Sequence, residues 1–308
     1  MDKITPFLCF NGQAEEAVRL YLEAFMDSKI MNITRLTSED VAALSELPKG
    51  EMPEEGSARF IQFQLAGQEM MAANGLAGFK FTPAVSLFVN CETAEELDAI
   101  WEKLSASGMV LMERDRYPFS ERFGWLADRF GVSWQLNLGK REKKIIPFLM
   151  FVKNGKAKEA VEFYTSFFKN SEILTMQIYG KGEEEPEGTV RHSIFKLEGQ
   201  ELMAIDSARD HQFSFSNGIS LYVSCENQEE VDALWERLSE RGEKQECGWL
   251  KDRYGVSWQV APKIVWKMVN DPNPGRAQRV LSAVAKMKKL DIDTLNKAYE
   301  GDMKIFQL

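Results

Sequence analysis

Histidines, which could serve as acid–base groups near neutral pH, are scarce in this sequence. Two histidines occur, His192 and His211, and imidazole is the side chain best suited to proton transfer near neutral pH. His192 lies in a run that alternates in polarity, which makes it a weak candidate for a general base. His211 lies in the segment ARDHQFSFSNG, which is typical of an exposed loop. The catalytic residues are therefore left unknown, with His192 as the one weak candidate.

The sequence segments that must form the elements positioning these residues occur twice along the chain, as an internal duplication. KITPFLCF at 3–10 returns as KIIPFLMF at 144–151, and GWLADRFGVSWQL at 124–136 returns as GWLKDRYGVSWQV at 248–260. The first copy is longer at 37–57 and 113–123, which we interpret as loop insertions. Three domains are expected, namely a first copy at 1–141, a second copy at 142–262 and a helical tail at 263–308.

Hydrophobic periodicity within each copy predicts the order strand, helix and three strands, followed by the same order again. Asn11 is expected to cap the first helix, and Thr93 with Glu96 forms a capping box for the second. In the first copy the strands are expected at 4–10, 29–36, 58–65, 69–73, 85–90, 109–112, 124–128 and 132–137. The fold class is therefore α+β, with four βαβββ modules and a C-terminal helical extension.

Several duplicated residues have simple structural interpretations. Asp128 and Asp252 precede Gly131 and Gly255, which predicts a hairpin turn in which the carboxylate accepts backbone N–H groups. The tryptophans on helix stripes or on the hydrocarbon side of strands are expected in the core: Trp101, Trp134, Trp235 and Trp258. Trp125 and Trp249 could instead line the mouth of a cavity.

Strand alternation places polar and aromatic residues together on one face of each sheet. If that face curls, it forms a pocket with apolar walls and a few hydrogen-bonding groups; otherwise it faces water. The expected ligand-binding residues are Phe7, Phe60, Gln62, Phe88, Gln135, Phe148, His192, Tyr222 and Gln259.

Charge and cysteine content exclude several classes of function. The net charge of -9 would repel phosphate groups, so neither nucleic acid nor an anionic membrane is an expected partner. The four cysteines show no Cys-x-x-Cys spacing and are too few for a disulfide framework, which favours the cytoplasm. The N-terminal residues lack the pattern of a signal peptide, and no apolar run approaches the length of a membrane span.

The four modules, the opening ITPFLCFNGQAEEAVRLYLEAF and the closing DRFGVSWQL resemble the vicinal oxygen chelate superfamily, which includes glyoxalase I, extradiol dioxygenases and bleomycin-binding proteins. More narrowly, the chain is similar to the PhnB-like branch, whose members are often labelled 3-demethylubiquinone methyltransferase-like. The tail DPNPGRAQRVLSAVAKMKKLDIDTLNKAYEG looks like the extension of longer members. The resemblance implies two cupped mixed sheets. It also implies, for active members, a divalent metal held by a His on each module's first strand and a Glu on its last.

The positions that the resemblance implies for metal binding carry poor ligands. In the first copy they fall near Thr5, Met71, Ala84 and Gln135, and in the second near Ile146, Ile205 or Asp206, Gly218 and Gln259. A divalent ion needs several imidazole, thiolate or carboxylate ligands. We therefore expect no metal and no cofactor, with Gln135 and Gln259 standing where a metal-ligating Glu would be.

Methyl transfer is also disfavoured by the residues. A nucleotide-binding turn needs glycines between a strand and a helix of a parallel unit. The one G-x-G, Gly180 to Gly182, is followed by three glutamates that would repel phosphate.

The leading hypothesis is a metal-independent protein that binds a small molecule of unknown identity. One alternative is a lyase, isomerase or oxygenase-type enzyme of the same superfamily, and another is an association scaffold whose cavities have closed. The two copies are expected to pair within the chain as a fused pseudo-dimer, and the tail could mediate a homodimer.

Overall fold

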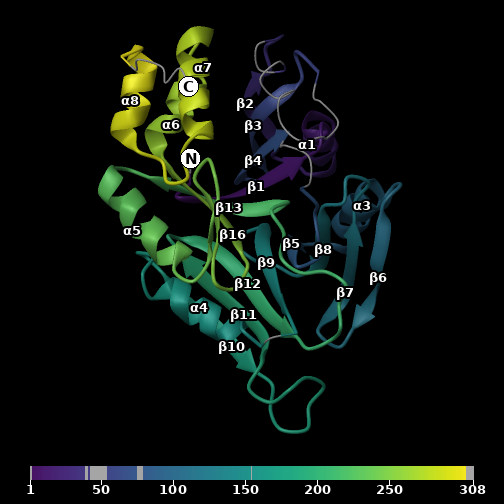
Figure 1. The fold of residues 1–308 in the computed structure, drawn as a ribbon. Coiled ribbons are helices and arrows are strands. Elements are labelled where there is room, and N and C mark those ends of the chain that lie inside the picture. The colour runs from purple at the N-terminus through teal and green to yellow at the C-terminus, as the bar shows by residue number, and fades with distance from the viewer. Residues whose placement is uncertain (1, 39–40, 42–53, 75–78, 154, 303–308) are drawn as a thin grey trace. The chain divides into compact units, whose positions relative to one another are not determined.

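The computed structural model describes residues 2–38, 41, 54–74, 79–153 and 155–302 (Figure 1). The first copy contains β1 (Ile4–Phe10), α1 (Ala14–Ala24), β2 (Lys29–Arg35), β3 (Ala58–Leu65), β4 (Gln68–Asn74), β5 (Val85–Cys91), α3 (Ala94–Ser105), β6 (Met109–Tyr117), β7 (Ser120–Ala127) and β8 (Ser133–Leu138). The second contains β9 (Ile145–Val152), α4 (Ala157–Thr165), β10 (Glu172–Ile178), β11 (Val190–Leu197), β12 (Gln200–Ser207), β13 (Ile219–Cys225), α5 (Gln228–Ser239), β14 (Glu243–Lys244), β15 (Trp249–Lys251) and β16 (Ser257–Pro262). The tail contains α6 (Lys263–Val269), α7 (Pro274–Ala285) and α8 (Ile292–Glu300).

The predicted α+β fold with four βαβββ modules and a helical tail is confirmed. The chain forms two compact units, one made of Pro6–Ile219 and the other of Met1–Thr5 with Ser220–Leu308. Within the second of these units the strand order is β14-β15-β16-β13. Most of the insertion expected at 37–57 lies outside the described residues.

An eight-stranded mixed sheet dominates the unit Pro6–Ile219, with the order β10-β11-β12-β9-β5-β8-β7-β6. Its centre is the antiparallel pair β5–β9, in which Val85 lies opposite Leu149 and Val89 opposite Ile145. Because β5 belongs to the first copy and β9 to the second, the two copies pair within the chain, as expected of a fused dimer. Unlike the sequence copies, this sheet combines the second module with the third.

Helices α3 and α4 pack on one face of the eight-stranded sheet. A Cβ atom on Gly124 of β7 would lie 2.3 Å from the Trp101 ring of α3, so glycine is required where the helix touches the strand. The expected core positions of four tryptophans are confirmed by exposed fractions of 0–7 %. Trp101 and Trp134 are buried in this unit, and Trp235 and Trp258 are buried in the other.

The predicted Asp128 turn is confirmed and is bonded more extensively than the sequence indicated. Asp128 Oδ1 accepts the backbone N–H groups of Phe130 at 2.9 Å and Val132 at 3.0 Å. Its Oδ2 accepts Trp134 Nε1 at 2.9 Å and the Tyr21 hydroxyl at 2.8 Å. Burial raises the pKa of this carboxyl, whereas the four hydrogen bonds oppose that rise. Asp128 therefore joins the turn, the strand β8 and the helix α1.

The expected cap at Asn11 is wrong. The N-cap of α1 is Gln13, and the side chain that bonds the first turn comes from β4, where Asn74 Oδ1 accepts Ala14 N–H at 2.9 Å. In the second copy Asp206 takes the same place and accepts Ala157 N–H at 3.0 Å. A cap supplied by another strand leaves no local signal, which explains the error. The predicted cap at Thr93 is confirmed, since its side chain accepts Glu96 N–H.

The insertion expected as a loop at 113–123 is instead an extension of the hairpin β6–β7. β6 is an edge strand with charged residues, which obscure the apolar alternation of a half-buried strand. Arg122 anchors the hairpin to α3 by donating two hydrogen bonds of 2.8 Å to Asp98. Arg114 pairs with the same carboxylate at 3.0 Å.

The tail packs within its own unit. Backbone N–H groups of Cys247 and Gly248 donate to Met287 and Lys288 carbonyls at 2.7 and 2.8 Å. Leu290 is 1 % exposed, and its side chain lies 3.3 Å from the place where a Cβ on Gly248 would stand. The Gln228 amide on α5 donates to the Leu290 carbonyl and accepts Ile292 N–H. The segment after α7 is thereby fixed beside α5 and β15.

Equivalent glutamines of the two copies meet inside the unit Pro6–Ile219. Gln68 Nε2 donates to Gln200 Oε1 at 3.0 Å, and Gln200 Nε2 donates to the Glu201 carbonyl at 2.8 Å. Gln68 Oε1 is buried and accepts no hydrogen bond from the described residues. The contact is therefore unequal, although its two partners are the same residue type.

Candidate functional site

The candidate site is the side of the eight-stranded sheet that carries the Gln135 side chain, opposite α3 and α4. We call this side the Gln135 face. Trp125 of β7 lies opposite Gln135 of β8, Gln135 lies opposite Phe88 of β5, and Phe88 lies opposite Ile146 of β9. Neighbours in register point to the same side of a sheet. An amide therefore stands between two aromatic side chains.

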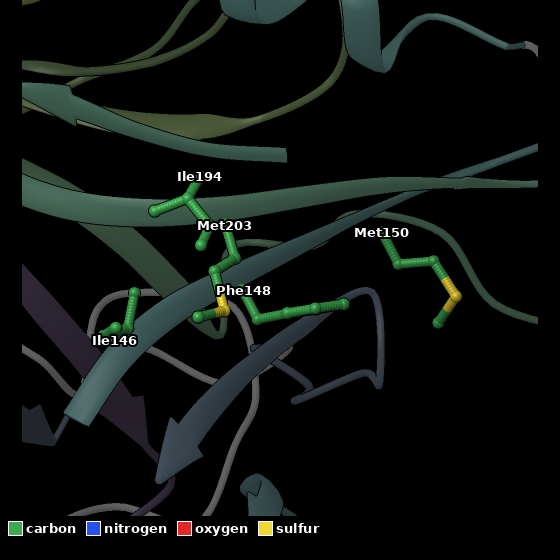
Figure 2. Packing of buried hydrophobic residues seen from close by; sticks show 5 residues of the cluster. All are labelled: Ile146, Phe148, Met150, Ile194 and Met203. Atoms are coloured by element: carbon green, nitrogen blue, oxygen red, sulfur yellow. The ribbon is translucent and has the colours of Figure 1, made fainter. Parts of the chain in front are cut away.

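An apolar cluster continues the Gln135 face across β9, β12 and β11. Figure 2 shows its buried members, which are 0–5 % exposed: Ile146, Phe148, Met150, Ile194 and Met203. The partly buried side chains packed against it are Phe88, Trp125, Val152, Ile205 and Phe213. Phe88 and Phe148 are stacked at 17° with centroids 6.0 Å apart. The amide of Gln135 is thus at the edge of a continuous hydrocarbon surface.

The Gln135 amide is 5 % exposed and makes no hydrogen bond to any described residue. Its equivalent in the other unit, Gln259, is 6 % exposed but donates to Ser220 Oγ at 2.9 Å. The amide nitrogen and oxygen of Gln135 are not among the fully buried, unpaired side-chain atoms of the described residues, so water still reaches them. Two identical residues in equivalent strands therefore differ in what they can offer a ligand.

A serine pair distinguishes the surroundings of Gln135 from those of Gln259. Ser86, the equivalent of Ser220, bonds to Ser133 Oγ at 2.9 Å, and Trp125 Nε1 donates to that same Ser133 oxygen at 2.8 Å. Both serines are thus engaged, and neither bonds to Gln135. The same residue types stand in both copies, so the sequence carries no signal for this difference.

His192 and Ile194 are two residues apart on β11, so their side chains point to the same side of the sheet. Since Ile194 belongs to the apolar cluster, His192 lies on the Gln135 face. No hydrogen bond joins its ring to the rest of the described chain. Burial, and secondly the positive charge of Arg141, lowers the pKa of His192 below its usual value. Its imidazole is therefore neutral at neutral pH and available as a proton acceptor.

Acidification is expected to destabilise the protein in part through His192. Because the folded-state pKa is lowered, the unfolded chain binds the proton first as pH falls through the ordinary histidine range, so folding stability falls with pH. In His192→Gln the contribution of this imidazole to the pH dependence of folding stability is absent. Urea unfolding of both proteins at pH 7.5 and 5.5 measures it. An equal pH-dependent loss in both would show that the imidazole resists protonation no more in the folded chain than in the unfolded one.

The expected exposure of His211 is wrong. Its ring is half-buried, shares a hydrogen bond of 3.0 Å with Ser207 Oγ and stacks on Phe213 with centroids 4.8 Å apart. Phe213 in turn packs on the apolar cluster. The loop assignment of the segment holds, but the aromatic residues in FSF draw the loop against the sheet. A further polar residue of the Gln135 face is Glu201, which the sequence does not single out. It is 8 % exposed and lies two residues before Met203 on β12, so both side chains point to the same side of the sheet.

The expected ligand-binding residues fall into three groups. Phe88, Gln135 and Phe148 lie on the neighbouring strands β5, β8 and β9 of the Gln135 face, whereas His192 lies on the same face but four strands from Gln135. Phe7, Phe60 and Gln62 lie on β1 and β3 of the same unit, where both Phe7 and Gln62 lie opposite Met71. Tyr222 and Gln259 are paired neighbours on β13 and β16 of the other unit.

The positions that the superfamily resemblance implies for metal do not fit a metal ion. Beside Gln135 and Gln259 they carry an aliphatic, thioether or glycine residue or a lone hydroxyl, and Asp206 is engaged in capping α4. Among the described residues no three His, Cys, Asp or Glu side chains gather in a way that could hold an ion. Burial raises the pKa of the Cys9 thiol, which reduces the thiolate fraction that nucleophilic attack requires.

Comparison with known proteins adds family and fold information. The chain matches the family model described as 3-demethylubiquinone-9 3-methyltransferase over residues 2–137 and 143–261. It is 20% identical over 142 residues to Protein YjdN of Escherichia coli, covering 45% of this chain and 97% of that protein. A putative 3-demethylubiquinone-9 3-methyltransferase, PhnB protein, from Bacillus cereus is 43% identical over 45% of this chain and 100% of its own, with a TM-score of 0.40. A glyoxalase I variant from Zea mays has a TM-score of 0.51 at 10% identity, covering 85% of this chain and 95% of its own.

Proposed function

Because the chain belongs to the family described as 3-demethylubiquinone-9 3-methyltransferase, matched once in each copy, we propose that it acts as a glyoxalase-like small-molecule-binding protein. In this proposal a ligand binds on the Gln135 face, without a metal ion. The observation that carries the proposal is the buried Gln135 amide, which has no hydrogen-bond partner among the described residues and stands beside aromatic side chains. Apolar walls with a few polar groups are typical of ligand sites.

Methyl transfer is not part of the proposal, although the family description names it. Gly180 and Gly182 lie between β10 and β11, which are antiparallel neighbours. A nucleotide-binding turn instead joins a strand to the N-terminus of a helix. Glu183 also bonds the Gly180 N–H that a phosphate would need.

The donor set supports the proposed metal independence. An amide oxygen beside aliphatic and thioether side chains does not satisfy a divalent cation, which prefers several imidazole, thiolate or carboxylate ligands. The Gln135 amide offers instead one donor group and one acceptor group to an organic molecule.

Matched substitutions at the two glutamines are expected to change stability in opposite directions. Gln135→Leu removes an amide that lacks a partner, so we expect the free energy of unfolding to stay equal or rise by about 1 kcal/mol. Gln259→Leu leaves the Ser220 hydroxyl without its partner, so we expect a loss of about 1–2 kcal/mol. Urea unfolding of the full chain measures both. Equal losses in the two variants would mean that Gln135 is bonded in solution.

A thermal-melt screen tests ligand binding. A ligand that binds the folded state raises the melting temperature in proportion to its occupancy. We expect shifts from small aromatic compounds in the wild type and in Gln259→Leu, and weaker shifts in Gln135→Leu for those compounds that carry hydrogen-bonding groups. Added divalent ions are expected to produce no shift. If no compound moves the wild-type melt, the Gln135 face is a closed core, as the 0–5 % exposure of its central cluster would then imply.

Catalysis by His192 is a second candidate function. The ring lies on the Gln135 face, is neutral at neutral pH, and could accept a proton from a bound substrate in a lyase, isomerase or oxygenase-type reaction. The test is turnover of any ligand that the melt screen finds. In that event His192→Gln would abolish turnover and leave the melt shift intact.

A cytoplasmic location completes the proposal. The four cysteines are free thiols in the structure, as expected in a reducing compartment. Of the helices in the described part of the chain, none is long and apolar enough to span a bilayer.

A further inference from the structure

We propose that the ligand of the Gln135 face is a neutral, flat heteroaromatic molecule that presents a lactam edge, meaning an N–H donor next to a C=O acceptor. This inference rests on the proposed function and specifies the chemical class of its ligand. It follows from the hydrogen-bonding capacity of Gln135, from the side chains on either side of it, and from the positions of the charges.

The hydrogen-bonding capacity of Gln135 selects an edge with both a donor and an acceptor. A side-chain amide has an NH2 donor and a C=O acceptor, and in Gln135 neither is used by a described residue. A lactam edge can hydrogen-bond to both groups at once, whereas an ether, a ketone or a hydrocarbon leaves one or both groups without a hydrogen bond. The amide atoms of Gln135 are not among the fully buried, unpaired atoms of the described residues, so a lactam edge would replace water at both groups.

The neighbouring side chains select a flat, aromatic body. The Trp125 indole N–H is already donated to Ser133, so this side chain offers a ligand its ring surface alone. On the other side of Gln135, Phe88 is stacked on Phe148 at 17°. Aromatic rings favour stacked or edge-to-face contacts with other rings.

The positions of the charges favour a neutral ligand. The residues of β7, β8 and β5 that lie in register around Gln135 on this face are uncharged: Phe123, Trp125, Ala127, Ser133, Asn137, Ser86, Phe88 and Asn90. The nearest acidic residues on the same side are Glu121, at the start of β7, and Asp115, opposite Phe123 on β6. Across the sheet, Glu201 stands on β12, and His192 and Lys196 stand on β11, at least three strands away in the order β11-β12-β9-β5-β8. A charged group placed at Gln135 would be desolvated without a counter-ion, which is costly.

Three probes of nearly equal size test the inference with the full chain. Quinolin-2(1H)-one has the lactam edge, quinoline has an acceptor alone, and naphthalene has neither. Equilibrium dialysis measures the three dissociation constants. We expect quinolin-2(1H)-one to bind about tenfold or more tightly than naphthalene, with quinoline between them, because a polar site rejects analogues that leave its groups unpaired.

Variants of Gln135 assign the preference to its amide. In Gln135→Leu the preference should disappear while naphthalene binding is kept, and in Gln259→Leu the preference should remain. Gln135→Glu replaces the donor by a second acceptor. That variant should favour protonated 2-aminoquinoline, whose amidinium edge carries two donors, over quinolin-2(1H)-one.

The outcomes separate the inference from the proposed function. Equal binding of all three probes by the wild type, or a lactam preference that survives in Gln135→Leu, overturns the inference and leaves a binding face of other specificity. Failure of all three probes to bind the wild type contradicts both the inference and the proposed function.

Discussion

Replacing Asp128 with alanine is expected to lower the free energy of unfolding by about 3–5 kcal/mol. The side chain is 3 % exposed and accepts four hydrogen bonds, from the backbone of Phe130 and Val132 and from Trp134 and Tyr21. Each buried donor left without a partner costs on the order of 1–3 kcal/mol, and partial relaxation keeps the total below the sum. Urea unfolding followed by tryptophan fluorescence measures the loss.

Asp128→Asn separates the hydrogen bonds from the packing. Asparagine keeps one acceptor oxygen, which can retain the two backbone bonds, but its NH2 group faces the Trp134 indole donor. We therefore expect a loss of about half that of Asp128→Ala. If alanine and asparagine cost the same, or if alanine costs less than 1 kcal/mol, the four bonds do not hold the turn in solution.

Leu290→Ala is expected to cost about 2–4 kcal/mol, the usual range for a fully buried leucine. Leu290 is 1 % exposed and packs on Gly248, where the tail hydrogen bonds to the segment before β15. The cavity left by the substitution should loosen the whole segment between α7 and α8. Urea unfolding measures the cost, and faster proteolysis within 286–291 would report the loosening.

Ile264→Ala is the matched control in the tail, because Ile264 is 38 % exposed. Its cost should stay below about 1 kcal/mol. Equal costs for the two substitutions would mean that the tail does not rest on its unit in solution, and would favour a role for it in association between chains.

Most of the fold could be predicted because hydrophobic alternation and duplication are local signals. Alternation predicts β3 at its observed bounds, and the spacing of Asp128 to Gly131 predicts the turn. The cap of α1 could not be predicted, because its oxygen comes from Asn74, sixty residues along the chain. The sequence does not predict the extended hairpin at 113–123, because an edge strand tolerates charged side chains on both sides.

The candidate site shows where the sequence lacks information. Strand alternation predicts that Phe88, Gln135, Phe148 and His192 share one face. The structure places the first three on neighbouring strands, and His192 on the same face four strands from Gln135. The difference between Gln135 and Gln259 could not be predicted, since their neighbouring serines are identical in the two copies. The difference depends on whether the serine hydroxyl points toward the glutamine, as Ser220 does, or toward another serine, as Ser86 does. Packing around each strand decides the direction of that hydroxyl.

The contact between Gln68 and Gln200 has an evolutionary consequence. In a symmetric pair of separate subunits, both partners of such a contact change together whenever the gene mutates. In a single chain each position varies alone, so the side with the unsatisfied oxygen can be repaired while the other keeps its bonds. Duplication within one gene thus opens a route to asymmetry at the contact between copies.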